Sequence, residues 1–176
     1  MNLSYINITK HYKHFKEAKV TYLSAFPKHE RLPFCIARFI AYRKGVSFKA
    51  IEIDNRFVGL IYLLEDKKSV YLLYFAIKEN ERNKSYGSNI LDDLLNQYAN
   101  KEFYLSIEIP NEIEPMTIRR FNFYKRHGLI SAEAYLHENI TYLLLANRNI
   151  DNFDNINSLL KKSFFFKYRP YVDANK

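Results

Sequence analysis

The chain has 176 residues, a length that fits one domain with a small terminal addition. Its composition is 48% hydrophobic and 16% aromatic, which can build a packed core and excludes a globally disordered chain. The net charge of +8 favours anionic partners, but the 27 basic residues are scattered along the sequence, as on an ordinary solvated surface.

The number of cysteines and the length of the apolar segments indicate in which cellular compartment the protein is expected. Cys35 is the single cysteine, so no disulfide can form within the chain, which suits a reducing environment. We expect Cys35 to pack in the core. The N-terminal segment lacks the apolar stretch of a signal peptide, and no apolar run approaches membrane-spanning length. These features predict a cytoplasmic protein with no membrane partner.

Two helices are expected first. The first begins near residue 10 and ends at Pro27, with apolar residues at spacings of three and four: Phe15, Ala18, Tyr22 and Phe26. The second opens after Pro33 and stops at Gly45, a placement typical of a first-turn proline and a C-terminal glycine.

Three strands are expected next, in the segments SFKAIEID, RFVGLIYLLED and SVYLLYFAIKE. Asp54-Asn55 and the residues DKKS separate them and suit tight hairpins, so the strands form an antiparallel meander. The third strand is apolar on both faces, which is typical of a central strand.

The second half predicts a helix after a polar turn, a strand EFYLSIEI, a helix TIRRFNFYKRHG closed by Gly128, and a final hairpin. This order predicts an α+β fold with a mixed, mostly antiparallel central sheet flanked by helices. We expect a single domain over residues 1–150. We expect residues 151–176 to form an aromatic, helical appendage packed on this domain, with Ile156, Leu159 and Leu160 on its apolar face.

The polar turn ENERNKSYGSNIL, residues 79–91, contains one of only four glycines. A strand that ends near Lys78 and a helix that begins near Ser85 leave backbone N–H groups at the positive end of the helix dipole. Such a helix start binds anions, Gly87 lets a phosphate approach the backbone, and Arg82 and Lys84 add cationic side chains. The same pattern also suits a capped helix with exposed charges.

Three motifs resemble the GCN5-related N-acetyltransferase (GNAT) superfamily. Arg82-Asn83-Lys84-Ser85-Tyr86-Gly87-Ser88 resembles the acyl-CoA signature R/Q-x-x-G-x-G/A, with Ser85 at the first glycine position. RRFNFYKRHGL resembles the second signature, and AFPKHERLPF resembles a segment between the first helices of some members. The order of strands and helices agrees with that family fold.

The resemblance implies acetyl-CoA as co-substrate and a GNAT-like acyl-CoA N-acyltransferase fold. Main-chain groups of Phe75, Ala76 and Ile77 would contact the pantetheine arm, and the pyrophosphate would lie on the N–H groups of residues 83–88. We expect Ser85 to present its N–H without backbone strain of its own. Its replacement of glycine could weaken coenzyme binding.

The implied reaction is direct attack of a neutral primary amine on the thioester. The resemblance makes Tyr124 the acid that protonates the leaving thiolate. Tyr124 could instead be a core tyrosine with a bonded hydroxyl. For the base, Glu108 and Glu30 are the main candidates and Glu52 is a third, and each could equally be half of an ion pair.

Other ionisable residues predict little chemistry. The side chains of His29, His127 and His137 are expected on the surface, and no metal site is predicted, because no His-x-x-x-His, Glu-x-x-His or cysteine partner is present.

Two other functions stay open. The positive charge with interleaved aromatic residues could serve a nucleic-acid-binding module. That reading is disfavoured, because the aromatics fall at core spacings. Ser85 motivates the other alternative, a non-catalytic acyl-CoA sensor.

The acceptor, a small-molecule or peptide amine, is not identified. The aromatic tail could line the acceptor pocket, cover a sheet edge or form a homodimer contact, with packing roles preferred.

Overall fold

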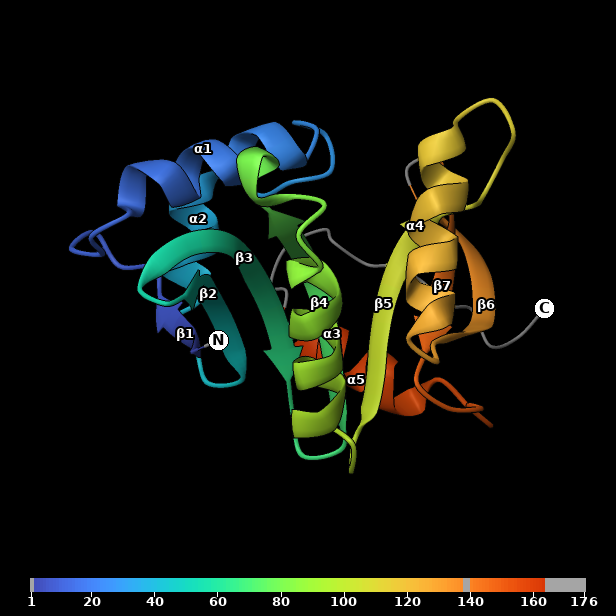
Figure 1. Ribbon diagram of the computed structural model, residues 1–176. Coiled ribbons are helices and arrows are strands. Elements are labelled where there is room, and N and C mark those ends of the chain that lie inside the picture. The colour runs from blue at the N-terminus through green and yellow to red at the C-terminus, as the bar shows by residue number, and fades with distance from the viewer. Residues whose placement is uncertain (1, 138–139, 164–176) are drawn as a thin grey trace. The chain divides into compact units, whose positions relative to one another are not determined.

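The computed structural model describes residues 2–137 and 140–163 (Figure 1). Seven strands form one sheet in the order β1-β2-β3-β4-β5-β7-β6, and helices accompany it. The predicted α+β class with a mostly antiparallel sheet is therefore confirmed. The chain divides into two compact units, Met1–Leu63 with Leu73–Ile90 and Leu64–Leu72 with Leu91–Lys176. We call them the first and the second unit and describe each by itself.

The first unit contains the two predicted helices and most of the predicted meander. Its elements are β1 (Leu3–Asn7), α1 (Phe15–Ala25), α2 (Phe34–Ile40), β2 (Val46–Ile53), most of β3 (Arg56–Glu65), the end of β4 (Ser69–Ile77), the 3-10 turn η1 (Glu79–Glu81) and the start of α3 (Tyr86–Gln97). Sequence reasoning missed β1, a short strand that pairs antiparallel with β2.

A cluster of aromatic rings forms the core of the first unit. Tyr22 of α1 lies with its ring centre 5.3 to 5.5 Å from those of Phe34, Phe48 and Tyr74, and it is fully buried. The apolar spacing of α1 therefore faces this cluster, as predicted. Cys35 does not join it: its side chain is exposed, so the expected core position was wrong. Proximity in sequence to Phe34 was not sufficient, because neighbouring residues of a helix point in different directions.

The β2–β3 hairpin turns at Asp54 and Asn55, with φ angles of 50° and 64°. Two successive left-handed residues are the signature of a tight hairpin turn, and Asp and Asn tolerate that conformation better than most residues. The predicted hairpin is confirmed at these residues. It places β3 next to β2 in the sheet.

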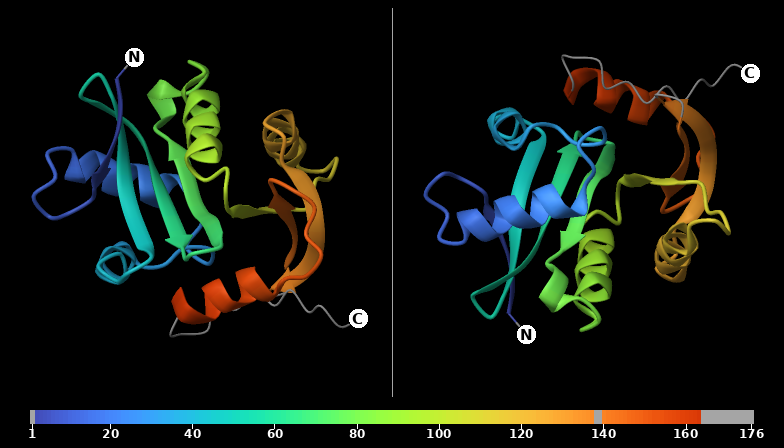
Figure 2. Two further views of the ribbon diagram at one scale, coloured as in Figure 1. Left: turned by 90° about the horizontal axis from the view of Figure 1, so that it is seen from below. Right: turned by 90° about the horizontal axis from the view of Figure 1, so that it is seen from above.

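The second unit begins with the last residues of β3 and the first residues of β4, and it holds the remaining elements. These are the rest of α3, β5 (Glu102–Glu108), α4 (Pro115–Arg126), β6 (Ile130–His137), β7 (Ile140–Ala146) and α5 (Asp154–Ser163). Figure 2 shows α4 and α5 on opposite sides of the three strands β5, β7 and β6. The predicted helical segment after residue 151 is present, and its residues Ile156, Leu159 and Leu160 are buried. Residues 164–176 of the predicted appendage lie outside the described residues.

The parallel pairing of β4 with β5 is short. It joins Ser69 to Glu102, Val70 to Phe103 and Tyr71 to Tyr104. β4 then continues to Ile77 and β5 to Glu108, but their ladder ends at Tyr71.

Candidate acetyl-CoA site

The turn after β4 has an irregular backbone. The 3-10 turn η1 is followed by extended Arg82, and α3 begins at Tyr86, close to the predicted helix start. Asn83 and Ser85 have φ angles of 61° and 60°, in the left-handed region. The helix itself gives no partner to the N–H groups of Tyr86 and Gly87, which belong to its first turn. The segment therefore has the geometry of an anion-binding helix start.

Ser85 differs from the expectation drawn from the sequence. It was expected to present its N–H without strain, but a non-glycine residue in the left-handed region costs about 1 kcal/mol. The signature's glycine avoids that cost, which gives a physical reason for glycine at this position. Ser85 adopts the left-handed backbone conformation although it is not a glycine. Its side chain is exposed.

The two cations of this segment have partners inside the protein. The Arg82 Nε donates a hydrogen bond to the Ile77 carbonyl oxygen at 3.2 Å. The Lys84 ammonium lies 2.9 Å from a carboxylate oxygen of Glu81, and about half of the Lys84 side chain is exposed. The Glu81 side chain is only 12% exposed, so a phosphate that binds Lys84 would compete with this ion pair.

The strand that would hold the pantetheine arm ends just before this turn. Ala76 is 6% exposed, and its neighbours Phe75 and Ile77 are partly exposed. Gly59 of β3 lies so close that a Cβ atom there would stand 2.4 Å from the Ala76 carbonyl oxygen. Sequence reasoning missed Gly59, although a glycine inside a strand signals a close backbone approach. A side chain there would push β4 out of position.

Tyr124 lies near the end of α4 in the second unit. Its side chain is 8% exposed, and among the described residues its hydroxyl has no hydrogen-bond partner. Burial raises the pKa of this phenol to about 12, against a smaller opposite effect from the positive charge of Arg120. A buried hydroxyl without a partner is uncommon in native proteins, and a catalytic role is one of its recognised explanations. The predicted alternative, a core tyrosine with a bonded hydroxyl, does not fit the described contacts.

The C-terminus of α4 fixes the position of Tyr124. The Tyr124 carbonyl accepts hydrogen bonds from His127 and Leu129, and Gly128 has a φ angle of 81°. A left-handed glycine after the last turn is a common helix C-cap, and buried Leu129 packs behind it. The predicted stop at Gly128 is confirmed. The expectation of an exposed His127 was wrong, because its side chain is only 12% exposed and contacts Asp92.

Glu108, the first candidate base, forms an ion pair. One of its carboxylate oxygens accepts a hydrogen bond from Arg120 at 3.3 Å, and its side chain is 31% exposed. The structure thus brings Glu108 and Tyr124 to the same residue of α4, since Arg120 acts on both. The carboxylate of Glu108 therefore already has a hydrogen-bond partner on α4.

Glu30, the second candidate, lies in the loop between α1 and α2. Its carboxylate is 3.7 Å from His29, whose side chain is largely exposed. The hydroxyl of Tyr74 fixes the backbone of this loop: it donates to the Glu30 carbonyl at 3.3 Å and accepts from the Leu32 N–H at 3.1 Å. Glu30 therefore belongs to an ordered loop held by a buried tyrosine of β4.

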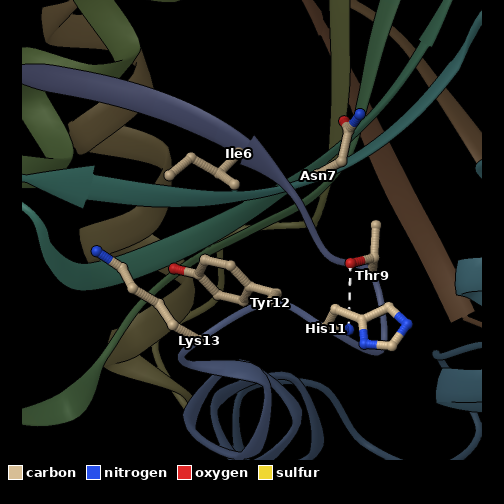
Figure 3. A pocket seen from close by; sticks show the side chains of 6 residues that line it. All are labelled: Ile6, Asn7, Thr9, His11, Tyr12 and Lys13. Atoms are coloured by element: carbon tan, nitrogen blue, oxygen red, sulfur yellow. Dashed lines mark hydrogen bonds between the residues drawn. The ribbon is translucent and has the colours of Figure 1, made fainter.

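Glu52, the third candidate base, is buried and forms an ion pair with Lys13. It is 1% exposed, accepts a hydrogen bond from the Tyr12 hydroxyl at 2.7 Å and lies 3.1 Å from the Lys13 ammonium. Tyr12 and Lys13 also line an open hollow of about 490 Å³ at the end of β1 (Figure 3). The other residues of this hollow are Ile6, Asn7, Thr9 and His11. No residue predicted for the site lines it, so it is not the candidate site.

The predicted site residues fall into two groups. The first unit contains Glu30, residues 75–77 and residues 82–88, and the second unit contains Glu108 and Tyr124. Within the described ranges, no group of three or more His, Cys, Asp and Glu side chains is arranged to hold a metal ion. None of the helices in the described part of the chain has the length and apolar content that a membrane crossing requires.

Comparison with known proteins gives one family. The model of the acetyltransferase (GNAT) family matches residues 10–129 of this chain. None of the curated proteins matches the sequence.

Solved structures share the fold. A GNAT-family acetyltransferase from Bacteroides thetaiotaomicron has a TM-score of 0.74 at 22% identity, over 92% of this chain and 95% of that one. Naa50 from Arabidopsis thaliana, in complex with the bisubstrate analogue CoA-Ac-MVNAL, has a TM-score of 0.61 at 21% identity, over 84% and 99%. A spermidine N-acetyltransferase chimera that includes the Vibrio cholerae enzyme has a TM-score of 0.64 at 11% identity, over 83% and 95%.

Proposed function

The chain belongs to the GNAT family of acetyltransferases, and we propose that it transfers the acetyl group of acetyl-CoA to a primary amine by direct attack. The acceptor is a peptide or a small-molecule amine, the two kinds of group that appear with Naa50 and the spermidine enzyme. The sensor and the nucleic-acid module are the alternatives that the experiments below separate from it.

The turn between β4 and α3 supports coenzyme binding. The N–H groups from Asn83 to Ser88 would receive the pyrophosphate, because the left-handed residues and the first turn of α3 form an anion site. Arg82 and Lys84 would add positive charge. Main-chain groups of residues 75–77, which follow the last β4 residue that pairs with β5, would pair with the pantetheine arm.

The observation that carries the proposal is the buried hydroxyl of Tyr124 with no partner among the described residues. With a pKa raised to about 12, this phenol keeps its proton at every physiological pH. As the C–S bond breaks, negative charge develops on sulfur, and a desolvated O–H donor stabilises it strongly. The thiolate would lie in the same desolvated surroundings, which raise its own proton affinity and favour transfer from Tyr124.

For the amine, Glu108 and Glu30 remain the candidate bases. Glu108 would attract a cationic amine before attack, and its carboxylate also contacts Arg120. Glu30 lies in a loop whose backbone is fixed, which suits contact with an acceptor.

The test is the variant Tyr124→Phe, with Tyr98→Phe as the matched control. Tyr98 is a phenol whose pKa burial also raises to about 12, but its hydroxyl is bonded to Glu65. We expect Tyr124→Phe to lower kcat by about a hundredfold with an unchanged Kd for acetyl-CoA, and Tyr98→Phe to leave kcat unchanged. Equal kcat values for the two variants would remove Tyr124 from the chemistry. Binding of acetyl-CoA by the wild type without any turnover would identify a sensor.

A further inference from the structure

The positive charge of the protein is concentrated in one of its two units. The first unit contains 14 Lys and Arg residues and 6 Asp and Glu residues, whereas the second unit contains 13 of each kind. The whole net charge of +8 therefore belongs to the first unit, although the basic residues are scattered along the sequence. Such an asymmetry of charge indicates a polyanionic partner, a nucleic acid or a membrane surface.

Five exposed lysines of the first unit have no ion-pair partner among the described residues. Nearby carboxylates are engaged elsewhere, since Glu17 is paired with Lys78 and buried Glu52 with Lys13. The five lysines are Lys10, Lys16, Lys19, Lys28 and Lys44. Their charge is therefore available to an anionic ligand.

Two aromatic rings of the first unit are exposed to solvent. Phe39 is 76% exposed and Tyr42 is 74% exposed. Every other Phe and Tyr side chain of residues 2–137 and 140–163 is buried or partly buried. The argument from core spacing against a nucleic-acid partner therefore does not apply to these two rings.

The two rings lie on the same side of the chain at the end of α2. The Tyr42 N–H donates a hydrogen bond to the Phe39 carbonyl oxygen at 3.3 Å, as in a 3-10 turn. Side chains three residues apart are eclipsed in such a turn, with a rise of about 6 Å between them. Arg43 and Lys44 follow directly, both side chains are exposed, and residues 31–51 contain no Asp or Glu.

The chemistry of this surface fits a single-stranded nucleic acid. An exposed ring can stack on any base, and lysine and arginine side chains contact phosphates. A second copy of the chain does not fit, because two units of the same charge would repel each other. A membrane surface fits less well, because binding by an amphipathic helix scales with its buried apolar area and α2 has seven residues.

We propose that Phe39, Tyr42, Arg43 and Lys44 form a binding surface for single-stranded RNA or DNA. Each ring would stack on one base, and the two cations would contact the neighbouring phosphates. The five lysines would add attraction over a longer range. No residue predicted for the coenzyme or for the chemistry belongs to this surface, so nucleic-acid binding would accompany acetyl transfer and not replace it.

The experiment measures fluorescence anisotropy of labelled oligouridylate and oligothymidylate with the full chain at several salt concentrations. The strands have about 12 nucleotides, within the usual site size of single-strand binding domains. A DNA duplex of the same length and vesicles of phosphatidylglycerol and phosphatidylcholine are tested in parallel. Thermal unfolding and the Kd for acetyl-CoA show whether each variant is folded.

The variants separate the rings from the apolar surface and from the charge. Phe39→Leu and Tyr42→Leu remove a ring but keep an apolar side chain, whereas Phe39→Tyr and Tyr42→Phe keep the ring. Lys44→Ala removes one cation. Its matched control is Lys67→Ala, at an exposed position of the second unit.

We expect the single strands to bind more tightly than the duplex, and each leucine variant to weaken their binding about tenfold. The variants that keep a ring and Lys67→Ala should remain near the wild type. Lys44→Ala should reduce the slope of log K against log salt by about 0.7. Tighter binding of oligouridylate would identify RNA as the natural partner, and tighter binding of oligothymidylate would identify DNA.

Four results would overturn the proposal. One is the absence of binding to either strand at low salt, and another is wild-type affinity in both leucine variants. Tighter binding of the duplex would show attraction by charge alone. Binding to the vesicles but not to the strands would assign the surface to a membrane. None of these results bears on acetyl transfer, since the Kd for acetyl-CoA is measured separately.

Discussion

The hydroxyl of Tyr74 accepts a hydrogen bond from the backbone N–H of Leu32 at 3.1 Å and so ties β4 to the loop between α1 and α2. The same hydroxyl donates to the Glu30 carbonyl. Tyr74 directly precedes Phe75, the first residue predicted to contact the pantetheine arm. One strand therefore carries both the expected coenzyme contacts and the anchor of a loop expected to contact the acceptor.

Removing this hydroxyl should loosen the loop. In Tyr74→Phe we expect KM for the amine to rise about fivefold, since a hydrogen bond contributes about 1 kcal/mol, with little change in Kd for acetyl-CoA. Tyr62→Phe is the control: Tyr62 is equally buried, and its hydroxyl donates at 3.2 Å to Ala37, inside α2. Steady-state kinetics with varied amine distinguish the two. Equal amine KM values in both variants would show that the loop does not contact the acceptor.

Much of the fold could be predicted from residue patterns. Apolar spacing located α1 and α3, and Asp54-Asn55 located a hairpin, because these signals are local. The strand β1 was missed, since five residues at a chain end offer little periodicity. The exposure of Cys35 was also missed, because it depends on which face of α2 meets the core.

The motifs of the candidate site can be read from the sequence, but the contacts that its residues make cannot. The spacing around Gly87 and Tyr124 is visible in sequence. The hydrogen bond from the Tyr74 hydroxyl to the Glu30 carbonyl joins residues 44 positions apart in the chain, and no local pattern specifies it. The same reasoning applies to Glu108, whose partner Arg120 lies on another element.

Replacement of Ser85 by glycine should increase the stability of the protein. In Ser85→Gly the left-handed strain of about 1 kcal/mol is relieved, partly offset by the greater freedom of glycine in the unfolded chain, so we expect a net gain of roughly 0.5 kcal/mol. Asn83→Gly is the control, because asparagine tolerates its φ of 61° better and should gain less. Urea unfolding measures stability, and calorimetry should show acetyl-CoA binding at least as tight as in the wild type. A loss of stability in Ser85→Gly would show that the serine side chain stabilises the turn.

Buried tyrosines should make the protein sensitive to alkali. Burial raises the pKa of Tyr22 and of Tyr124 above the ordinary value of 10.0. The unfolded chain loses these protons above about pH 10 while the folded chain keeps them, so their contribution is complete below pH 10 and is lost as pH rises through the folded pKa. Each such tyrosine lowers the free energy of unfolding by about 1.4 kcal/mol per pH unit in that window.

Urea unfolding between pH 9 and 11.5 checks this slope. Tyr22→Phe should reduce it, whereas Tyr42→Phe should not, because the Tyr42 side chain is 74% exposed. A free energy of unfolding that stays constant from pH 10 to 11 would contradict the assigned burial of these phenols.

The most direct test of the account is calorimetric titration of the protein with acetyl-CoA. The wild type is compared with Gly87→Glu, which places a bulky anion at the expected pyrophosphate position. Asn96→Glu is the control, because it adds the same charge to an exposed position near the other end of α3. We predict that the wild type and Asn96→Glu bind acetyl-CoA and that Gly87→Glu does not. Equal binding by all three proteins would place the coenzyme elsewhere, and no binding by the wild type would contradict the central claim that this chain uses acetyl-CoA.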